Sequence, residues 1–227
     1  MYTLHIANKN YSSWSLRPWA LLRQLGIPFD EKLSVFGEGS NYDEFREFAP
    51  NGLVPCLIDG DTTVWDSLAI IEYVAEDHPA VWPADKVARA WARSASAEMH
   101  SGFSTLRNHC PMNCGLRVAI KQISPRLQRD IDRIDELWNE GLSRFGGPFL
   151  AGQKFTAVDA YYAPVAYRIR GFALSVSEPV AAYVERLLAT DALLEWERAA
   201  IAEPWRELAH EAEALQYGEL VKDYRST

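Results

Sequence analysis

The stretch NGLVPCLIDGDTTVWDSLAIIEYV, residues 51–74, decides the fold of this chain. An apolar run, Pro55 to Ile58, is followed by a turn at 59–61 and by a second β-rich run, Thr62 to Trp65. From Ser67 to Ala75 the apolar residues then recur at helical spacing. The pattern therefore predicts a β-hairpin that runs directly into a helix.

Pro55 opens the first strand of this hairpin. Proline has no N–H to give to a sheet, so it belongs at a strand start. A cis bond at that position leaves the backbone of the preceding residue, Val54, free to pair with a ligand. We therefore expect the Val54-Pro55 bond to be cis and Val54 to act as an edge strand of one residue.

Asp66 and Ser67 stand at the start of the following helix. The unpaired N–H groups and the positive dipole end of a helix start attract a carboxylate. Ser67 can hydrogen-bond that carboxylate, and Asp66 can hold an ammonium group. Each of these dipeptides alone is typical of ordinary caps and strand edges. Together with Val54 they predict a site for an extended peptide that ends in a free amino acid.

The composition is that of an ordinary globular protein. The 227 residues are 48% hydrophobic, which suffices for one large domain or two small ones with a buried core. A formal net charge of −8 argues against nucleic acid and anionic membrane surfaces as partners, because both bind basic patches. The N-terminus has no apolar signal core and no stretch is long enough to span a bilayer, so we expect a cytoplasmic protein.

The segments before the hairpin alternate between strand and helix patterns. The expected elements are a strand over Tyr2–Ala7, a helix over 15–27 that Gly26 ends, a strand over 28–36 and a weak helix over Tyr42–Phe48. The resulting order is β-α-β-α-β-β-α. A helical crossover between the first two strands predicts parallel pairing, and the hairpin predicts an antiparallel edge.

Beyond residue 78 the pattern changes to helices, and we expect no further strand. The expected helices cover Val87–Asn108, Pro125–Phe145 and Ala157–Gly171, with shorter pieces after Pro179. The sequence thus predicts an α/β domain over 1–78, a linker over 79–86 and an all-helical domain over 87–227. At the start of the third helix, Thr156 and Asp159 have the spacing of a capping box, which nucleates a helix and carries no chemistry.

Four motifs in order resemble the glutathione transferase family, and the resemblance covers nearly the whole chain. They are YSSWSLRPW (11–19), Val54-Pro55, Asp66-Ser67 and FLAGQKFTAVDAYYAP (149–164). The resemblance implies a thioredoxin-like N-terminal domain that binds glutathione as a cosubstrate. It also implies a helical domain that supplies the pocket for a small hydrophobic electrophile, usually in a homodimer. Carried over by position, Val54 pairs with the cysteinyl backbone of glutathione, while Asp66 and Ser67 hold its γ-glutamyl end.

The catalytic residue is expected where the first strand meets the first helix. A thiol with a pKa near 8.5 is mostly protonated at neutral pH, so a hydroxyl donor at the helix start must stabilise the thiolate. Serine-type members of the family, the theta and zeta classes, place their serine fourteen residues before the glycine that ends this helix. Counting back from Gly26 gives Ser12, and the Ser-Ser pair of the zeta class resembles Ser12-Ser13. Both serines remain candidates, and Tyr11 is a poorer one.

The resemblance has two departures, and it leaves the reaction open. The zeta pattern has a cysteine where Trp14 stands, and polar residues where Gly52-Leu53 precede the Val-Pro motif. Conjugation of an electrophile is the preferred interpretation. Cis-trans isomerisation of a dicarboxylate, of the maleylacetoacetate type, is the nearest alternative, and a cationic pocket would favour it. A glutathione-binding or structural module without turnover is the third.

Several polar residues near these motifs are expected to carry no chemistry. Arg17 is expected to be an exposed or ion-paired side chain. The spacing of His100, His109, Cys110 and Cys114 fits no common zinc pattern, so we expect no metal site.

Overall fold

The computed structural model describes residues 1–37 and 39–225. Its N-terminal part is a four-stranded mixed sheet with the order β2-β1-β3-β4. The strands are β1 (Tyr2–Ala7), β2 (Phe29–Ser34), β3 (Cys56–Asp59) and β4 (Thr62–Val64). Strand β1 pairs parallel with β2 and antiparallel with β3, which in turn pairs antiparallel with β4. The predicted element order, the parallel crossover and the hairpin are confirmed.

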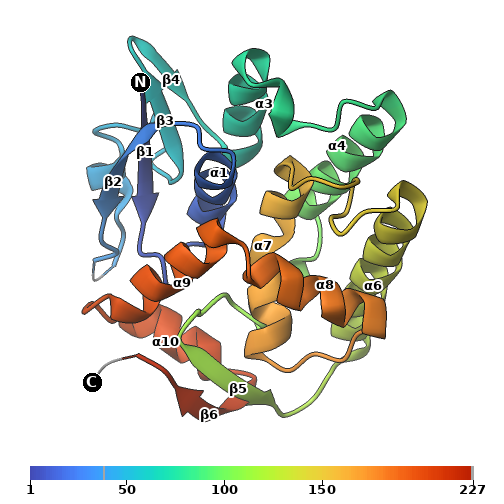
Figure 1. The fold of residues 1–227 in the computed structure, drawn as a ribbon. Coiled ribbons are helices and arrows are strands. Elements are labelled where there is room, and N and C mark those ends of the chain that lie inside the picture. Colours follow the sequence, from blue (N-terminus) through green and yellow to red (C-terminus); the bar gives the residue numbers. More distant parts are fainter. Residues whose placement is uncertain (38, 226–227) are drawn as a thin grey trace.

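Three helices complete this part of the chain: α1 (Ser13–Gln24), α2 (Tyr42–Phe45) and α3 (Ser67–Asp77). Ser12 is the N-cap of α1, and Gly26 follows its end with a φ of +66°, a left-handed conformation that glycine adopts without strain. Helices α1 and α3 lie on the face of the sheet that is turned towards most of the helices that follow them (Figure 1). The starts of both helices are thereby held close to the boundary between the two parts of the molecule.

The second part is mainly helical and surrounds one buried helix. Its elements are η1 (Pro79–Val81), α4 (Lys86–Ser101), α5 (Ser104–His109), α6 (Pro125–Phe145), α7 (Ala157–Gly171), α8 (Glu178–Leu188), α9 (Asp191–Ala202) and α10 (Leu208–Leu215). Helix α7 runs through the centre, and nearly all of its residues are buried (Figure 1). The helices predicted over 125–145 and 157–171 are confirmed, as is the capping box of Thr156 and Asp159.

The single long helix expected over Val87–Asn108 is wrong, because the chain breaks into α4 and α5. Phe103 has a φ of +56°, which no continuing helix allows. The start of α5 is held instead by a distant residue: the N–H of Leu106 donates to Oδ2 of Asp130 on α6 at 2.9 Å. A capping partner 24 residues away leaves no local signal in the sequence.

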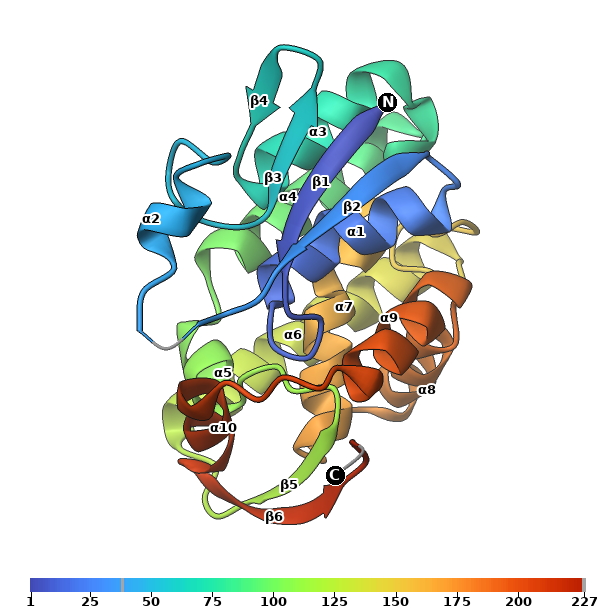
Figure 2. The same ribbon diagram turned by 90° about the vertical axis from the view of Figure 1, so that its left-hand side faces the viewer.

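The expectation that no strand follows the boundary is also wrong. Strands β5 (Leu116–Ile120) and β6 (Gly218–Asp223) form an antiparallel pair, with a register shift between Arg117 and Val118. In β5, buried Leu116 and Val118 alternate with less buried neighbours, which is the period of a strand. The partner strand lies about a hundred residues further on, and β6 is almost entirely exposed. Figure 2 shows the pair beside α10, at the end of the molecule away from α3.

Within residues 1–37 and 39–225, we find no helix with both the length and the apolar composition that crossing a membrane requires.

Candidate functional site

Two serine hydroxyls lie at the start of α1, and they differ in their surroundings. Ser12 is buried, and its Oγ donates to Oγ of Ser15 at 2.7 Å. Ser15 Oγ also accepts the N–H of Ala7 from the end of β1 at 3.2 Å, which anchors the pair. Ser13 is half-buried, and its hydroxyl has no partner among the described residues. The helix start therefore presents one ordered and one unengaged hydroxyl.

Tyr11 is held away from this role by the C-terminal helix. Its Oη donates to Oε1 of Glu211 on α10 at 2.6 Å. Burial, followed by the hydrogen bond to Glu211, raises the pKa of Tyr11 to about 12. A phenol that holds its proton this tightly, and already gives it to a carboxylate, is a poor donor to a ligand.

The Val54-Pro55 bond is cis, as the sequence predicts. Val54 precedes β3 and stands outside its ladder. In the described chain, no residue takes a hydrogen bond from the Val54 N–H or gives one to its carbonyl. The Trp65-Asp66 bond is also cis, which nothing in the sequence indicated.

A cavity of about 400 Å³ brings the start of α1 and Val54 together with the helical part. The lining residues are Tyr11, Ser12, Ser13, Trp14, Phe36, Leu53, Val54, Arg107, Asn108, Pro111, Met112, Arg168, His210 and Glu213. Both predicted catalytic serines and Val54 thus share one cavity. Asp66 and Ser67 lie outside its lining.

Two arginines outnumber the one acidic residue of the lining, Glu213, and give this cavity a net positive charge. Arg107 of α5 and Arg168 of α7 line it, and in the part of the chain that the structure describes neither forms an ion pair. Arg168 Nε donates to the carbonyl of Cys110 at 2.9 Å, but its Nη1 has no partner. Burial, followed by the neighbouring charge of Arg17, lowers the pKa of Arg168 to about 9, so the group stays charged at neutral pH.

Arg17 departs from its expected position, because it is neither exposed nor ion-paired. It is fully buried, and none of its three guanidinium nitrogens has a hydrogen-bond partner among the described residues. Its Cζ lies 4.0 Å from the ring centroid of Trp14 and 4.6 Å from that of Tyr161. Stacking on two aromatic rings is a favourable environment for a desolvated guanidinium. Arg17 therefore adds a buried positive charge behind the cavity.

The start of α3 is the second cluster of polar groups. Asp66 is the N-cap, and its side chain is 51% exposed. Ser67 is fully buried, and its Oγ lies 2.9 Å from Oη of Tyr161 on α7. The same Oη lies 3.0 Å from Nδ1 of His100 on α4. Sequence reasoning missed His100 and Tyr161 here, because both come from helices that follow the hairpin by tens of residues.

The two clusters are neighbours. The ring of Trp14, which lines the cavity, lies edge-on to the ring of His100 at 5.4 Å between centroids. Nε2 of His100 is in turn 3.8 Å from Oδ2 of Asp66. The six residues predicted for the site, Ser12, Ser13, Val54, Pro55, Asp66 and Ser67, therefore fall in two adjoining places that Trp14 and His100 connect.

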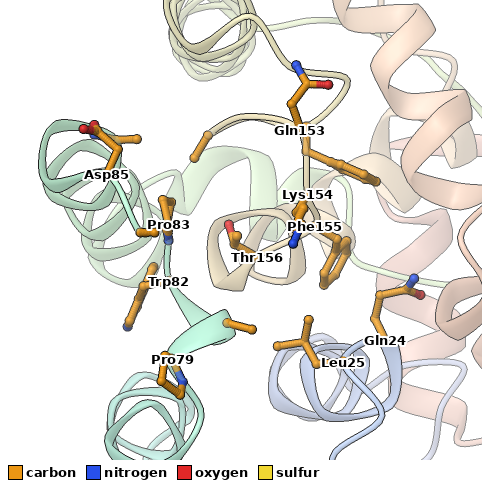
Figure 3. A pocket seen from close by; sticks show the side chains of 15 residues that line it. Gln24, Leu25, Pro79, Trp82, Pro83, Asp85, Gln153, Lys154, Phe155 and Thr156 are labelled. Atoms are coloured by element: carbon orange, nitrogen blue, oxygen red, sulfur yellow. The ribbon is translucent and has the colours of Figure 1, made fainter.

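A larger cavity of about 710 Å³ lies elsewhere and contains none of the predicted site residues. Figure 3 shows Leu25, Trp82, Phe155 and Thr156 around it, contributed by α1, the segment before α4 and the start of α7. Two of its polar side chains are engaged in helix caps, because Asp85 caps α4 and Thr156 belongs to the capping box, whereas Nε1 of Trp82 has no partner in the described chain. This cavity offers apolar surface and no reactive constellation.

The cysteines and histidines do not assemble a metal site. Within the described ranges, no group of three or more His, Cys, Asp or Glu side chains is arranged to hold a metal ion. Burial raises the pKa of the Cys56 thiol to about 11 and that of Cys110 to about 12. Neither thiol is therefore a nucleophile at neutral pH.

Comparisons with known proteins identify several relatives of this chain. Residues 11–77 match the family described as "Glutathione S-transferase, N-terminal domain". A probable maleylacetoacetate isomerase of Vibrio cholerae is 30% identical over 151 residues, covering 64% of this chain and 70% of that protein. A zeta-class glutathione S-transferase of Euphorbia esula is 28% identical over 157 residues, covering 67% and 70%. A Burkholderia glutathione transferase homologue, solved with bound glutathione, has the same fold, with a TM-score of 0.66, 22% identity and coverage of 88% and 97%.

Proposed function

The chain belongs to the glutathione S-transferase family, and from that membership we propose that it is an enzyme that activates the thiol of glutathione for attack on a small electrophile. The observation that carries the proposal is the cavity in which Ser12, Ser13 and the free backbone of Val54 meet. Residues 1–78 bind glutathione in this proposal. Residues 87–227 supply the pocket for the electrophile.

Glutathione lies across the two polar clusters. The unpaired N–H of Val54 donates to the backbone of the cysteinyl residue and its unpaired C=O accepts from it, as when a strand is added at a sheet edge. The half-exposed carboxylate of Asp66 holds the ammonium group of the γ-glutamyl end. The N-terminus of α3, at Ser67, favours the α-carboxylate beside it. With the cysteinyl backbone and the γ-glutamyl end held in this way, the thiol of the ligand lies at the start of α1 in this proposal.

The serine pair stabilises the thiolate. Ser12 and Ser15 are within hydrogen-bonding distance of each other, so each hydroxyl can donate to the other. When Ser15 donates to Ser12, the O–H of Ser12 becomes free for the thiolate, and the N–H of Ala7 keeps Ser15 in place. The positive end of the α1 dipole acts in the same direction. Half-buried Ser13, one residue on, is the alternative donor.

The electrophile occupies the part of the cavity next to α5 and α7. Phe36, Pro111 and Met112 give it apolar surface, while Arg107 and Arg168 give it two positive charges. A hydrophobic electrophile that also carries an anionic group fits this lining better than a wholly apolar one. A charged arginine without an acidic partner is stabilised when a carboxylate binds to it.

A second candidate reaction is favoured by the same two arginines. A glutathione-dependent cis-trans isomerase of an unsaturated dicarboxylate needs a cationic pocket for both carboxylates, and Arg107 and Arg168 provide two cations. In such a reaction the thiolate adds to the double bond and leaves again after rotation. Glutathione is then recovered unchanged.

One screen separates these reactions. The purified protein is incubated with glutathione and aryl halides, epoxides, peroxides and maleyl-type acids, and thiol consumption is followed alongside the absorbance of each acceptor. Conjugation consumes thiol with at least one electrophile, and anionic acceptors are expected to react faster than neutral ones of the same type. Isomerisation changes the spectrum of a maleyl-type acid without consuming thiol.

Three further measurements test the rest of the proposal. Retention on immobilised glutathione with no reaction of any acceptor would contradict the enzymatic function and leave a glutathione-binding module. Arg168→Met tests the acceptor pocket, because it should slow anionic acceptors more than neutral ones.

We further propose that the chain forms a homodimer, which sedimentation of the purified protein checks.

A further inference from the structure

The groups exposed at the start of α3 are not the pair that the sequence indicates. Ser67 has no exposed surface. The side chains of Asp66 and His100 are 51% and 29% exposed, and Nε2 of His100 lies 3.8 Å from Oδ2 of Asp66. A ligand that arrives here therefore meets a carboxylate and an imidazole side by side.

The carboxylate of Asp66 favours one tautomer of His100. Its Oδ2 lies 3.8 Å from Nε2, and its negative charge stabilises the tautomer that carries the proton on Nε2. In the neutral ring Nδ1 then accepts the O–H of Tyr161 at 3.0 Å. Oη of Tyr161 in turn accepts the O–H of Ser67 at 2.9 Å. In this chain of hydrogen bonds Ser67 donates to Tyr161 and Tyr161 donates to His100, so the Nε2–H of His100 beside Asp66 is the last donor.

The charges around the ring favour an anion next to His100. The guanidinium of Arg17 stacks on the ring of Tyr161, the residue that bonds Nδ1. Arg107 Nη1 donates to the backbone carbonyl of His100 at 3.4 Å. Asp66 is the acid that faces the ring. Two cations on one side and one carboxylate on the other suit a zwitterion.

We propose that His100 is a ligand-contacting, specificity-determining residue of the glutamyl subsite, whose Nε2–H binds the free α-carboxylate of the ligand while Asp66 binds its ammonium group. The inference rests on the proposed glutathione function. The two charges of an α-amino acid are separated by a single carbon, which matches the spacing of His100 and Asp66. Tyr161 and Ser67 are positioning residues that fix the ring and its tautomer.

Calorimetry with two peptides tests the inference. Glutathione is compared with 4-aminobutanoyl-Cys-Gly, which lacks only the α-carboxylate. The wild-type protein should bind glutathione about tenfold or more tightly than the analogue, because a hydrogen bond to a charged group is lost. In His100→Ala most of this preference should be lost, and only the smaller contribution of the α3 N-terminus should remain. His100→Gln, which keeps a neutral donor near the Nε2 position, should recover part of the ratio.

Two further variants separate the contact from a general effect on folding. Tyr161→Phe removes the hydrogen-bond partner of Nδ1. It should reduce the ratio of the two peptide affinities, although each peptide should still bind. His109→Gln makes the same chemical change at a ring that stacks on Tyr217 away from the site, and it should keep the wild-type ratio. Circular dichroism of each variant checks that it is folded.

The outcomes are distinct. A wild-type ratio retained in His100→Ala, or no preference for glutathione in the wild-type protein, would overturn the role of His100 while leaving glutathione binding intact. Equal weakening of both peptides in His100→Ala would also overturn it, because a purely structural role predicts that result. Failure of the wild-type protein to bind either peptide would reject the proposed function itself, and this inference with it.

Discussion

The starts of α1 and α7 use polar side chains for opposite purposes. At α7 the carboxylate of Asp159 accepts the N–H groups of Leu150 and Thr156 and the hydroxyl of Tyr183, and nothing there is exposed. At α1 the hydroxyl of Ser12 has one serine partner and borders a cationic cavity. A helix start whose hydrogen-bonding groups all have protein partners stabilises the fold. A helix start whose hydrogen-bonding groups are not all engaged can bind a ligand.

The largest expected effect is at Ser12. Ser12→Ala should lower kcat by about 10²–10³, because one donor to the thiolate is lost from a preorganised site. Its effect on glutathione affinity should be much smaller, since the ground-state thiol needs the donor less. Steady-state kinetics with any acceptor found in the screen measure both. Ser13→Ala is the matched control, and a loss confined to that variant would move the role by one residue.

Asp159→Ala should have the reverse profile. It leaves several buried donors without an acceptor, so the free energy of unfolding should fall by about 3 kcal/mol. The bound glutathione thiol should titrate as in the wild-type protein. Denaturant unfolding measures the first quantity, with Asp132→Ala on the exposed face of α6 as a control. Normal stability with lost activity would refute the division between the two helix starts.

The same carboxyl should make stability depend on pH. Burial, opposed by the hydrogen bonds it accepts, raises the pKa of Asp159 from 3.8 to about 6 in the folded protein. The folded state therefore holds this proton more tightly than the unfolded state, and stability falls as pH rises from 4 to 6. Relative to Asp159→Asn, the wild-type protein should lose on the order of 2–3 kcal/mol across that range. A difference in the free energy of unfolding between the two proteins that stays the same at every pH would contradict the assignment.

Asp66→Asn should act on binding alone. Removing the charge that holds the ammonium group of the ligand should weaken glutathione roughly tenfold, as for a hydrogen bond to a charged group. Ser67→Ala should also weaken it, because the hydroxyl chain to Tyr161 and His100 is broken. Calorimetry measures both effects, and the melting temperature of each variant should equal that of the wild-type protein. Unchanged affinity in the two variants would remove α3 from the glutathione site.

The comparison also shows which features a sequence reveals. The hairpin, the bounds of α6 and α7 and the capping box were all predicted, because turn residues, apolar period and caps act over a few neighbours. The cis bond at Val54-Pro55 was predicted for the same reason.

Features that need a distant partner were not predicted. Strands β5 and β6 pair across about a hundred residues, and the break between α4 and α5 depends on Asp130 of α6. Arg17 was expected to be exposed or ion-paired. Trp14 is close to it in the sequence, but the second ring that encloses it, that of Tyr161, comes from α7. The contacts of Ser67 with Tyr161 and of Tyr161 with His100 span 94 and 61 residues. The site was therefore predictable where it rests on single helix starts, and not where the helical part completes it.

The central claim is that the start of α1 stabilises the glutathione thiolate, and the ultraviolet absorbance of the bound thiolate tests it most directly. Titration of the wild-type complex should give a thiol pKa well below the ordinary value of about 8.5. That pKa should return towards 8.5 in Ser12→Ala and stay low in Tyr11→Phe. A bound thiol that titrates like free glutathione in the wild-type protein, or one that depends on Tyr11 instead, would contradict the account.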